Sequence, residues 1–252
     1  MASHPRTAPL RDVVRENADI ESSSDQYAFR FRGPVGQWFL AVQTRITLEA
    51  LAGLPPGARV LDVGGGHAQV APPLIEAGYR VTIVGSDPSC GARLRPWTSS
   101  GQCTFEVADL LHLPYADHAF DAVICYRLVA HSVNWTQLIN ELCRVSADRV
   151  IVDYPAKRSV NIISRSLFDM KRSIEGVTTR RFSLYGRDEM SRAFESAGFR
   201  VTAHRPQFLM PMVLYRLAGS ALFARLAEWP ARRLGLTHLL GSPVIARADR
   251  RR

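Results

Sequence analysis

Apolar residues follow two different patterns along the middle of the chain. Runs such as 59–63 (RVLDV) are short and apolar, as expected of buried strands, whereas 135–145 (WTQLINELCRV) has apolar positions every three or four residues, as expected of an amphipathic helix. Alternation of the two patterns predicts a parallel sheet covered by helices on both faces. The predicted strands are 59–63, 80–84, 103–109, 120–126, 148–154, 199–205 and 243–248, and the helical segments are 37–51, 67–77, 135–145 and 187–197, with a short helix or loop at 88–100.

Two segments depart from this alternation. Residues 1–24 are polar and irregular, so a flexible N-terminal tail is expected there. Segment 208–241 is long for a connection between the last two strands, and it is apolar nearly all round. Pro211 and Pro230 are expected to frame a helix of roughly 18 residues within it.

The composition fits one domain with an ordinary surface. The chain has 252 residues, of which 46% are hydrophobic, enough for one substantial core. The 32 Lys and Arg residues exceed the 23 Asp and Glu residues, giving a formal charge of +9, and much of the excess lies near the C-terminal end. A solvated basic surface is favoured over a surface that binds nucleic acid or an anionic membrane.

The cysteines favour a reducing compartment. Cys90, Cys103, Cys125 and Cys143 are widely spaced and form no CxxC pair, so neither zinc nor another metal site is expected. A cytoplasmic location fits best, because the N-terminus lacks the apolar core of a signal peptide and no apolar run is long enough to span a bilayer.

A glycine-rich turn follows the first predicted strand, in the stretch RVLDVGGGHAQ at 59–69. Glycines at the carboxyl end of a strand let a ligand approach bare main chain and the N–H groups beyond it. The turn lacks the Gly-Lys-Ser/Thr of a phosphate-binding loop, and Gln69 stands where a dinucleotide fingerprint needs its third glycine. The pattern therefore suits a ligand with a carboxylate and an ammonium group.

VLDVGGGHA resembles the first motif of class I S-adenosylmethionine-dependent methyltransferases. VADLLHLPYADHAFDAVICYRLVAHSVNW at 107–135 is similar to the adenine segment, fourth strand and following loop of that family, in order and at the usual separations. YGRDEMSRAFESAGFRV at 185–201 resembles the late helix and sixth strand more loosely. The type 11-like small-molecule branch, which includes quinone C-methyltransferases, is nearest in style.

The resemblance implies an α/β fold with a Rossmann-like, doubly wound, mostly parallel sheet of seven strands. The last strand is expected to be antiparallel, with a helical insertion before it. A single methyltransferase domain, 25–252, would follow the flexible tail. Its expected parts are an N-terminal helical lid at 25–57, a cofactor-binding core at 58–155, and a C-terminal substrate half at 156–252 that contains the insertion 208–241.

The resemblance also implies S-adenosylmethionine as the cofactor. Gly64 and Gly66 would let main chain meet its methionine part, with Gly65 serving the turn. Asp62 would hold the turn and reach the ammonium group, the alternative being a purely structural cap. Asp87 is assigned to the ribose hydroxyls; if it caps a helix instead, Ser86 or main-chain groups take that role.

Five further residues complete the implied cofactor site. Asp109 would accept a hydrogen bond from the adenine amino group, and the main chain of Leu110 would donate to a ring nitrogen. Tyr126 and Arg127 follow the fourth strand and are expected beside the cofactor. Tyr27 is expected to fold over it from the lid.

Methyl transfer needs a base only where the acceptor loses a proton. His131, in AHSVNW, is the predicted base, and the alternative is a helix-start histidine bonded to main chain. Tyr154, which ends the fifth strand, is the other predicted catalytic residue, through substrate contact, unless it is a rim aromatic.

The acceptor is predicted to be a small or lipid-like molecule rather than nucleic acid. The motifs that nucleic-acid amino-methylating, pyrimidine carbon-5 and protein arginine enzymes carry after the fourth strand are missing from CYRL. Segment 208–241 is expected to cover the sheet edge, to form a homodimer contact, to close over an apolar acceptor, or to lie on a membrane with Arg232 and Arg233 toward anionic lipid. The predicted function is methyl transfer to a small, hydrophobic acceptor; the alternative is a catalytically silent cofactor- or partner-binding protein on the same fold.

Overall fold

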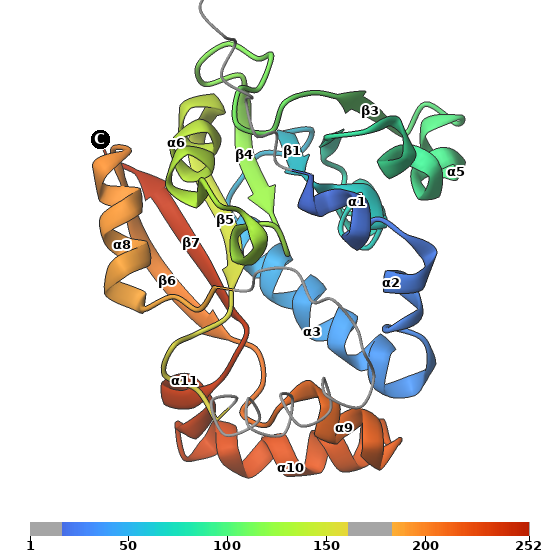
Figure 1. Ribbon diagram of the computed structural model, residues 1–252, viewed down its shortest axis with the longest axis vertical. Coiled ribbons are helices and arrows are strands. Elements are labelled where there is room, and N and C mark those ends of the chain that lie inside the picture. Colours follow the sequence, from blue (N-terminus) through green and yellow to red (C-terminus); the bar gives the residue numbers. More distant parts are fainter. Residues whose placement is uncertain (1–16, 161–182, 252) are drawn as a thin grey trace, which may run out of the picture.

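Seven strands form one mixed sheet in the computed structural model, which describes residues 17–160 and 183–251 of the chain (Figure 1). The strand order is β3-β2-β1-β4-β5-β7-β6, and β7 is antiparallel to both of its neighbours. This confirms the predicted fold class. The strands are β1 Arg59–Val63, β2 Arg80–Gly85, β3 Cys103–Val107, β4 Phe120–Cys125, β5 Ser146–Tyr154, β6 Phe199–Pro206 and β7 Val244–Arg250.

Helices cover both faces of the sheet, because successive strand residues point to opposite sides. Leu61 and Val123 pack in one core cluster with α6 and α8, whereas Val60 and Ile124 pack in a second cluster with α3 and α4. The α-helices are α1 Ala18–Ser22, α2 Asp25–Phe29, α3 Gly33–Leu51, α4 Ala71–Glu76, α5 Arg95–Thr98, α6 Trp135–Val145, α8 Arg187–Ser196, α9 Met212–Ala218, α10 Ala221–Arg233 and α11 Leu236–Leu240; the 3₁₀ turns are η1 Gly65–His67, η2 Pro88–Leu94 and η3 Val129–His131.

The parallel strands place their carboxyl ends at one edge of the sheet. The turns after β1, β2, β3, β4 and β5 all begin at this edge, which is where a doubly wound sheet binds its ligands. Tyr154 of β5 and Pro206 of β6 both pair with Val244 of β7, so β6 ends at the same edge as β5. The insertion 208–241 therefore starts beside the site edge.

The expectation of a flexible tail over 1–24 is wrong for its last part. Residues 18–22 form α1, and Asp19 and Ser22 are buried. The remainder, 1–16, lies outside the described residues. Of the expected lid at 25–57, Phe39 and Ile46 of α3 belong to the core. Helix α1, which precedes the expected lid, contacts the turn after β1, and the lid role of 25–57 stays a prediction.

The expected single helix between Pro211 and Pro230 is two helices. Gly219 takes a left-handed conformation, with φ of 67°, that ends α9, and the Ser220 side chain then caps α10 by accepting from the Phe223 N–H. Pro230 lies inside α10, in its last turn, rather than after it.

Candidate functional site

The glycine turn after β1 is closely packed on every side. Gly64 has a φ of 75° and donates its N–H to the Val84 carbonyl at 2.8 Å. A Cβ at Gly65 would lie 2.0 Å from Oδ2 of Asp62, and a Cβ at Gly66 would lie 2.3 Å from the Cys90 carbonyl oxygen. Side chains are therefore excluded here by the aspartate below the turn and by η2 beside it.

Asp62 is fully buried beneath this turn. Neither of its carboxylate oxygens has a hydrogen-bond partner within the described chain. Burial raises the pKa of Asp62 to about 7, against an opposing effect of the nearby Arg127 guanidinium. An unpartnered buried carboxylate is costly for folding alone, so its chemistry suits a cationic ligand group.

His67 presents a second unpartnered atom at the turn. Its Nδ1 accepts the Gln69 N–H at 3.1 Å, which assigns the proton to Nε2, and Nε2 has no partner in the described residues. Burial, together with Arg127 and Arg93, lowers the pKa of His67 well below its usual value. The imidazole is therefore neutral and offers one N–H to a ligand.

Helix α1 lies against the glycine turn and the end of β2. The Asp19 carboxylate accepts from the Ser86 N–H at 2.7 Å and the Ser86 hydroxyl at 2.6 Å, and the Cys90 thiol donates to it at 3.3 Å. A Cβ at Gly64 would lie 3.4 Å from the Asp19 Cβ. Sequence reasoning missed Asp19, since its segment has no periodicity and follows no strand.

Arg127 joins four parts of the site edge. It has a left-handed φ of 62°, and its N–H donates to Oδ1 of Asp153 at 2.6 Å. Its guanidinium donates to the Gln43 and Gln69 side-chain oxygens. Gln69, which breaks the dinucleotide fingerprint, thus serves as a partner for Arg127.

Aromatic rings from the N-terminal segment cover this guanidinium. It lies 4.5 Å from the centroid of the Phe31 ring and 5.6 Å from that of Tyr27. Such stacking holds Arg127 at the site while leaving its charge in place. Tyr27 is therefore positioned by Arg127, and its predicted contact with the cofactor stays a prediction.

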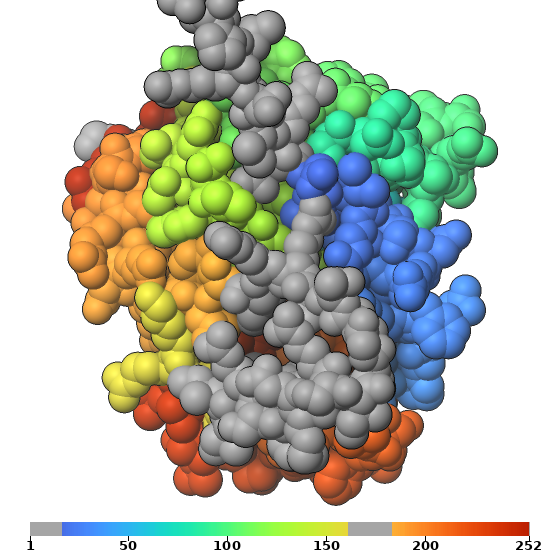
Figure 2. Space-filling model, viewed as in Figure 1, coloured from blue at the N-terminus to red at the C-terminus, as the bar shows by residue number. Residues whose placement is uncertain are grey.

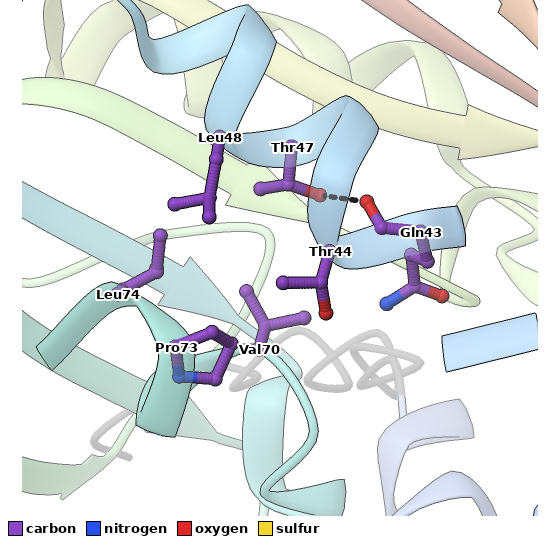
Figure 3. A pocket seen from close by; sticks show the side chains of 7 residues that line it. All are labelled: Gln43, Thr44, Thr47, Leu48, Val70, Pro73 and Leu74. Atoms are coloured by element: carbon purple, nitrogen blue, oxygen red, sulfur yellow. Dashed lines mark hydrogen bonds between the residues drawn. The ribbon is translucent and has the colours of Figure 1, made fainter. Parts of the chain in front are cut away.

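Tyr126 faces the core rather than the site edge. Its side chain is fully buried, and its hydroxyl shares a 2.7 Å hydrogen bond with that of Thr47 on α3. A narrow hollow opens between α3 and α4, where the Thr47 hydroxyl donates to the Gln43 carbonyl (Figure 3). Leu48, Val70, Pro73 and Leu74 make most of its lining apolar, so it is not a site for a charged ligand.

Asp87 follows β2 and caps η2. Its Oδ1 accepts the Ser89 N–H at 2.8 Å, and hydrogen bonding to Ser89 lowers the pKa of this exposed carboxyl. The capping alternative for Asp87 is thus realised. The predicted contact of Asp87 with the ribose stays a prediction.

Asp109 organises the turn after β3. Its Oδ1 accepts the Leu111 N–H, and its Oδ2 lies 3.0 Å from Nδ1 of His112. The intervening Leu110 side chain is fully buried. Both residues lie at the predicted edge, and their adenine contacts remain predictions.

The two predicted catalytic residues have different surroundings. His131 ends η3, is half-buried, and lies near enough to Asp153 to oppose the rise that burial causes in the pKa of that carboxyl. Tyr154 is fully buried, and its hydroxyl lies 2.9 Å from Nδ1 of His204 on β6. Asp153 was not predicted, although an acid one residue before the end of β5 is the signal that marks it.

These positions define a class of protein. A doubly wound sheet carries a glycine turn, a buried unpartnered acid and further acids after β2 and β3 at one edge, as expected for a ligand with a charged amino-acid end and a nucleoside end. Within the described ranges, no three His, Cys, Asp or Glu side chains are grouped to hold a metal ion.

Comparison with known proteins gives the family. Residues 38–204 match the family model described as a methyltransferase domain. A demethylmenaquinone methyltransferase of Deinococcus radiodurans is 37% identical over 118 residues, or 44% of this chain and 48% of that protein. The chain thus spans about half the length of this curated relative.

Solved structures share the fold at low sequence identity. Magnesium protoporphyrin IX methyltransferase from Synechocystis PCC 6803 with bound SAH has a TM-score of 0.60 and 17% identity, covering 92% of this chain and 97% of that one. The [4+2]-cyclase SpnF has a TM-score of 0.56 and 20% identity, covering 82% and 80%.

The chain belongs to the methyltransferase domain family, with the class I fold that uses S-adenosylmethionine. The residues fit that cofactor. The unpartnered Asp62 oxygens, buried beneath the glycine turn, suit its ammonium group.

Proposed function

We propose that this protein transfers a methyl group from S-adenosylmethionine to a small, hydrophobic acceptor. The unpartnered carboxylate of Asp62 carries the proposal. A buried acid without a partner is retained at a cost to folding, and an ammonium group at the glycine turn would remove that cost. No nucleotide phosphate could do the same, because it would repel the carboxylate.

The cofactor supplies a methyl group already activated on a sulfonium centre, so the protein mainly binds and aligns. In this proposal Asp62 and the main chain of 64–66 hold the methionine part. Asp87 holds the ribose, and Asp109 with Leu110 holds the adenine. Arg127, fixed by two glutamines and two rings, carries a positive charge suited to the cofactor carboxylate.

His131 is the proposed base for acceptors that must lose a proton. The imidazole is half-buried at the end of η3 and lies near the Asp153 carboxyl group at the site edge. Tyr154 is not assigned as a base, because burial raises the pKa of its phenol and its hydroxyl is hydrogen-bonded to His204. In this proposal its side chain forms part of the wall of the acceptor site. This division predicts that His131→Ala lowers turnover while Tyr154→Phe mainly raises KM.

The apolar acceptor is supported by two observations. Relatives are named for demethylmenaquinone and magnesium protoporphyrin IX, which are small molecules. The insertion beside the site edge exposes many large apolar side chains. The four buried, unpaired cysteines suit a reducing compartment, and we propose the cytoplasm. No described helix is both long and apolar enough to cross a bilayer.

The test is transfer from methyl-labelled S-adenosylmethionine into a host-cell extract, with the labelled product identified by mass. We expect a labelled small molecule with the wild type, and loss of the label with Asp62→Asn. An exposed substitution, Arg45→Gln, is the matched control and should leave the product unchanged. Labelled protein or nucleic acid would contradict the proposal.

The second candidate is a protein that binds the cofactor without methyl transfer. One neighbour of this fold is titled a [4+2]-cyclase, so the fold alone does not imply methyl transfer. Calorimetric binding of S-adenosylmethionine with no labelled product across a broad metabolite extract would favour this candidate.

A further inference from the structure

The C-terminal helices present a concentrated apolar surface. Among the described residues, thirteen large apolar side chains are exposed, and nine of them belong to 214–239, so the apolar exposure is not scattered. We call this surface the apolar face. Its members are Leu214, Leu217, Leu222, Phe223, Leu226, Trp229, Leu234, Leu236 and Leu239.

The outer side of α10 forms the centre of this face. Leu222, Leu226 and Trp229 recur at helical spacing and are 67%, 65% and 61% exposed. The inner side of the same helix is buried through Ala224 and Ala231. The large apolar residues of α10 therefore face solvent, whereas small residues such as Ala224 pack in the core cluster that contains α3.

The solvent-exposed charges on α10 are positive. Glu228 is the single acid in 208–241, and it is buried, where its carboxylate accepts from the Tyr215 hydroxyl, the Leu209 N–H and the Thr237 hydroxyl. Arg225 and Arg233 are exposed, and the Arg233 guanidinium lies 5.1 Å from the Trp229 ring centroid. Arginine and tryptophan beside exposed leucines suit the boundary between lipid headgroups and acyl chains.

The segment that carries the apolar face starts beside the site edge. Since Pro206 and Tyr154 flank Val244, the insertion starts next to the carboxyl end of β5. Figure 1 shows α9, α10 and α11 together at one end of the molecule, and Figure 2 shows the same segment, in orange and red, at that end of the surface.

We propose that the apolar face docks on an anionic lipid bilayer, with α10 lying in the interface. Exposed apolar side chains with Arg225 and Arg233 on the same helix match such a surface in both respects. A second copy of the chain is disfavoured as the occupant, because a two-fold contact through α10 would bring arginines together with no exposed acid of 208–241 to pair them.

The first experiment is sedimentation of the full-length protein with phosphatidylcholine vesicles, with and without one quarter phosphatidylglycerol. We expect binding to the anionic vesicles that weakens as salt is raised. Leu222→Ser with Leu226→Ser should weaken it at least tenfold, and Arg225→Glu with Arg233→Glu by about tenfold or more.

Matched controls lie outside the face. Val107→Ser changes an exposed apolar residue on β3, and Arg192→Glu changes an exposed arginine on α8. Both should bind vesicles like the wild type. Circular dichroism verifies that every variant is folded.

Tryptophan fluorescence locates the contact. Brominated lipid should quench the emission of Trp229, and Trp229→Phe should keep sedimentation within about twofold while losing that quenching. The proposal is overturned if the wild type does not bind anionic vesicles, if both double variants bind like the wild type, or if light scattering shows a dimer that the leucine variant separates. Because no cofactor is present, the result does not depend on methyl transfer.

Discussion

The two edges of the sheet treat buried polar groups in opposite ways. At the carboxyl edge, the Asp62 carboxylate and Nε2 of His67 are buried without partners in the described chain. At the opposite edge, the buried Arg149 guanidinium donates to the Ala50 and Ala52 carbonyls and to Asp148 at 2.7 to 3.1 Å. The first arrangement is costly for folding and the second stabilises it.

The two edges show which buried or clustered polar groups stabilise the fold and which are available to a ligand. The opposite edge has a hollow lined by acids and arginines, but these charges pair with one another: Arg247 bonds Asp249, and Arg149 bonds Asp148. Charge in a hollow therefore does not mark a ligand site. A buried polar group without a hydrogen-bond partner, such as Asp62, is the better indicator of a ligand site. The following variants test this contrast between the two edges.

The largest expected effect is at the glycine turn. Gly65→Ala places a Cβ 2.0 Å from Oδ2 of Asp62, whose side chain is fully buried and would have to shift. We expect the calorimetric Kd for S-adenosylmethionine to rise at least about a hundredfold, near 3 kcal/mol. Gly78→Ala is the control: its φ of 85° is strained for alanine, but nothing lies within 4 Å, so only stability should fall. Unchanged affinity in Gly65→Ala would contradict the site.

At the opposite edge the effect should be on stability alone. Arg149→Met leaves two carbonyls and Asp148 without their donor, and we expect the free energy of unfolding in urea to fall by about 3 kcal/mol. The Kd for the cofactor should not change. A large loss of affinity in this variant would mean that the two edges are not independent.

Asp62→Asn should have the reverse profile. Removing a buried, unpartnered charge should leave the free energy of unfolding at neutral pH unchanged or higher. The Kd for the cofactor should rise by about tenfold to a hundredfold, since the ammonium loses its carboxylate. A destabilised variant with normal affinity would assign Asp62 to the structural cap instead.

The pH dependence of stability sharpens the same point. Asp62 has a pKa of about 7 in the folded chain against an ordinary value of 3.8, so the folded state binds the proton more tightly than the unfolded state. The Asp62 contribution to stability is therefore present below pH 4 and is lost at about 1.4 kcal/mol per unit as pH rises toward 7. The wild type measured against Asp62→Asn, without cofactor, should show this slope. Parallel profiles would refute the raised pKa.

The smallest effect is expected after β2. Asp87→Asn keeps a good capping side chain for η2, so thermal stability should be unchanged. The Kd for S-adenosylmethionine should rise by about tenfold if the carboxylate also binds the ribose hydroxyls. A wild-type Kd would leave Asp87 as a cap and move the ribose contact to Ser86 or main chain.

Most strands and long helices follow from local pattern. The runs at 59–63 and 80–84 match β1 and β2 within one residue, because a strand buried on both faces must be apolar throughout. The late start of α4 follows from Pro72 and Pro73, which the structure places in its first turn. The break at Gly219 was missed, because a continuous apolar pattern hides a change of helix direction.

The site was predictable only where it is continuous with a strand. Asp62 and 64–66 follow β1 directly, so the sequence determines the glycine turn, the acid before it and the parallel sheet that places both. The tertiary structure alone decides that Asp19 meets Ser86, that Gln43 and Gln69 hold Arg127, and that Tyr126 turns into the core. These contacts join residues 58 to 84 positions apart, with no local periodicity to reveal them. Local pattern reflects whether a residue is buried, whereas the identity of its partner depends on how distant elements pack.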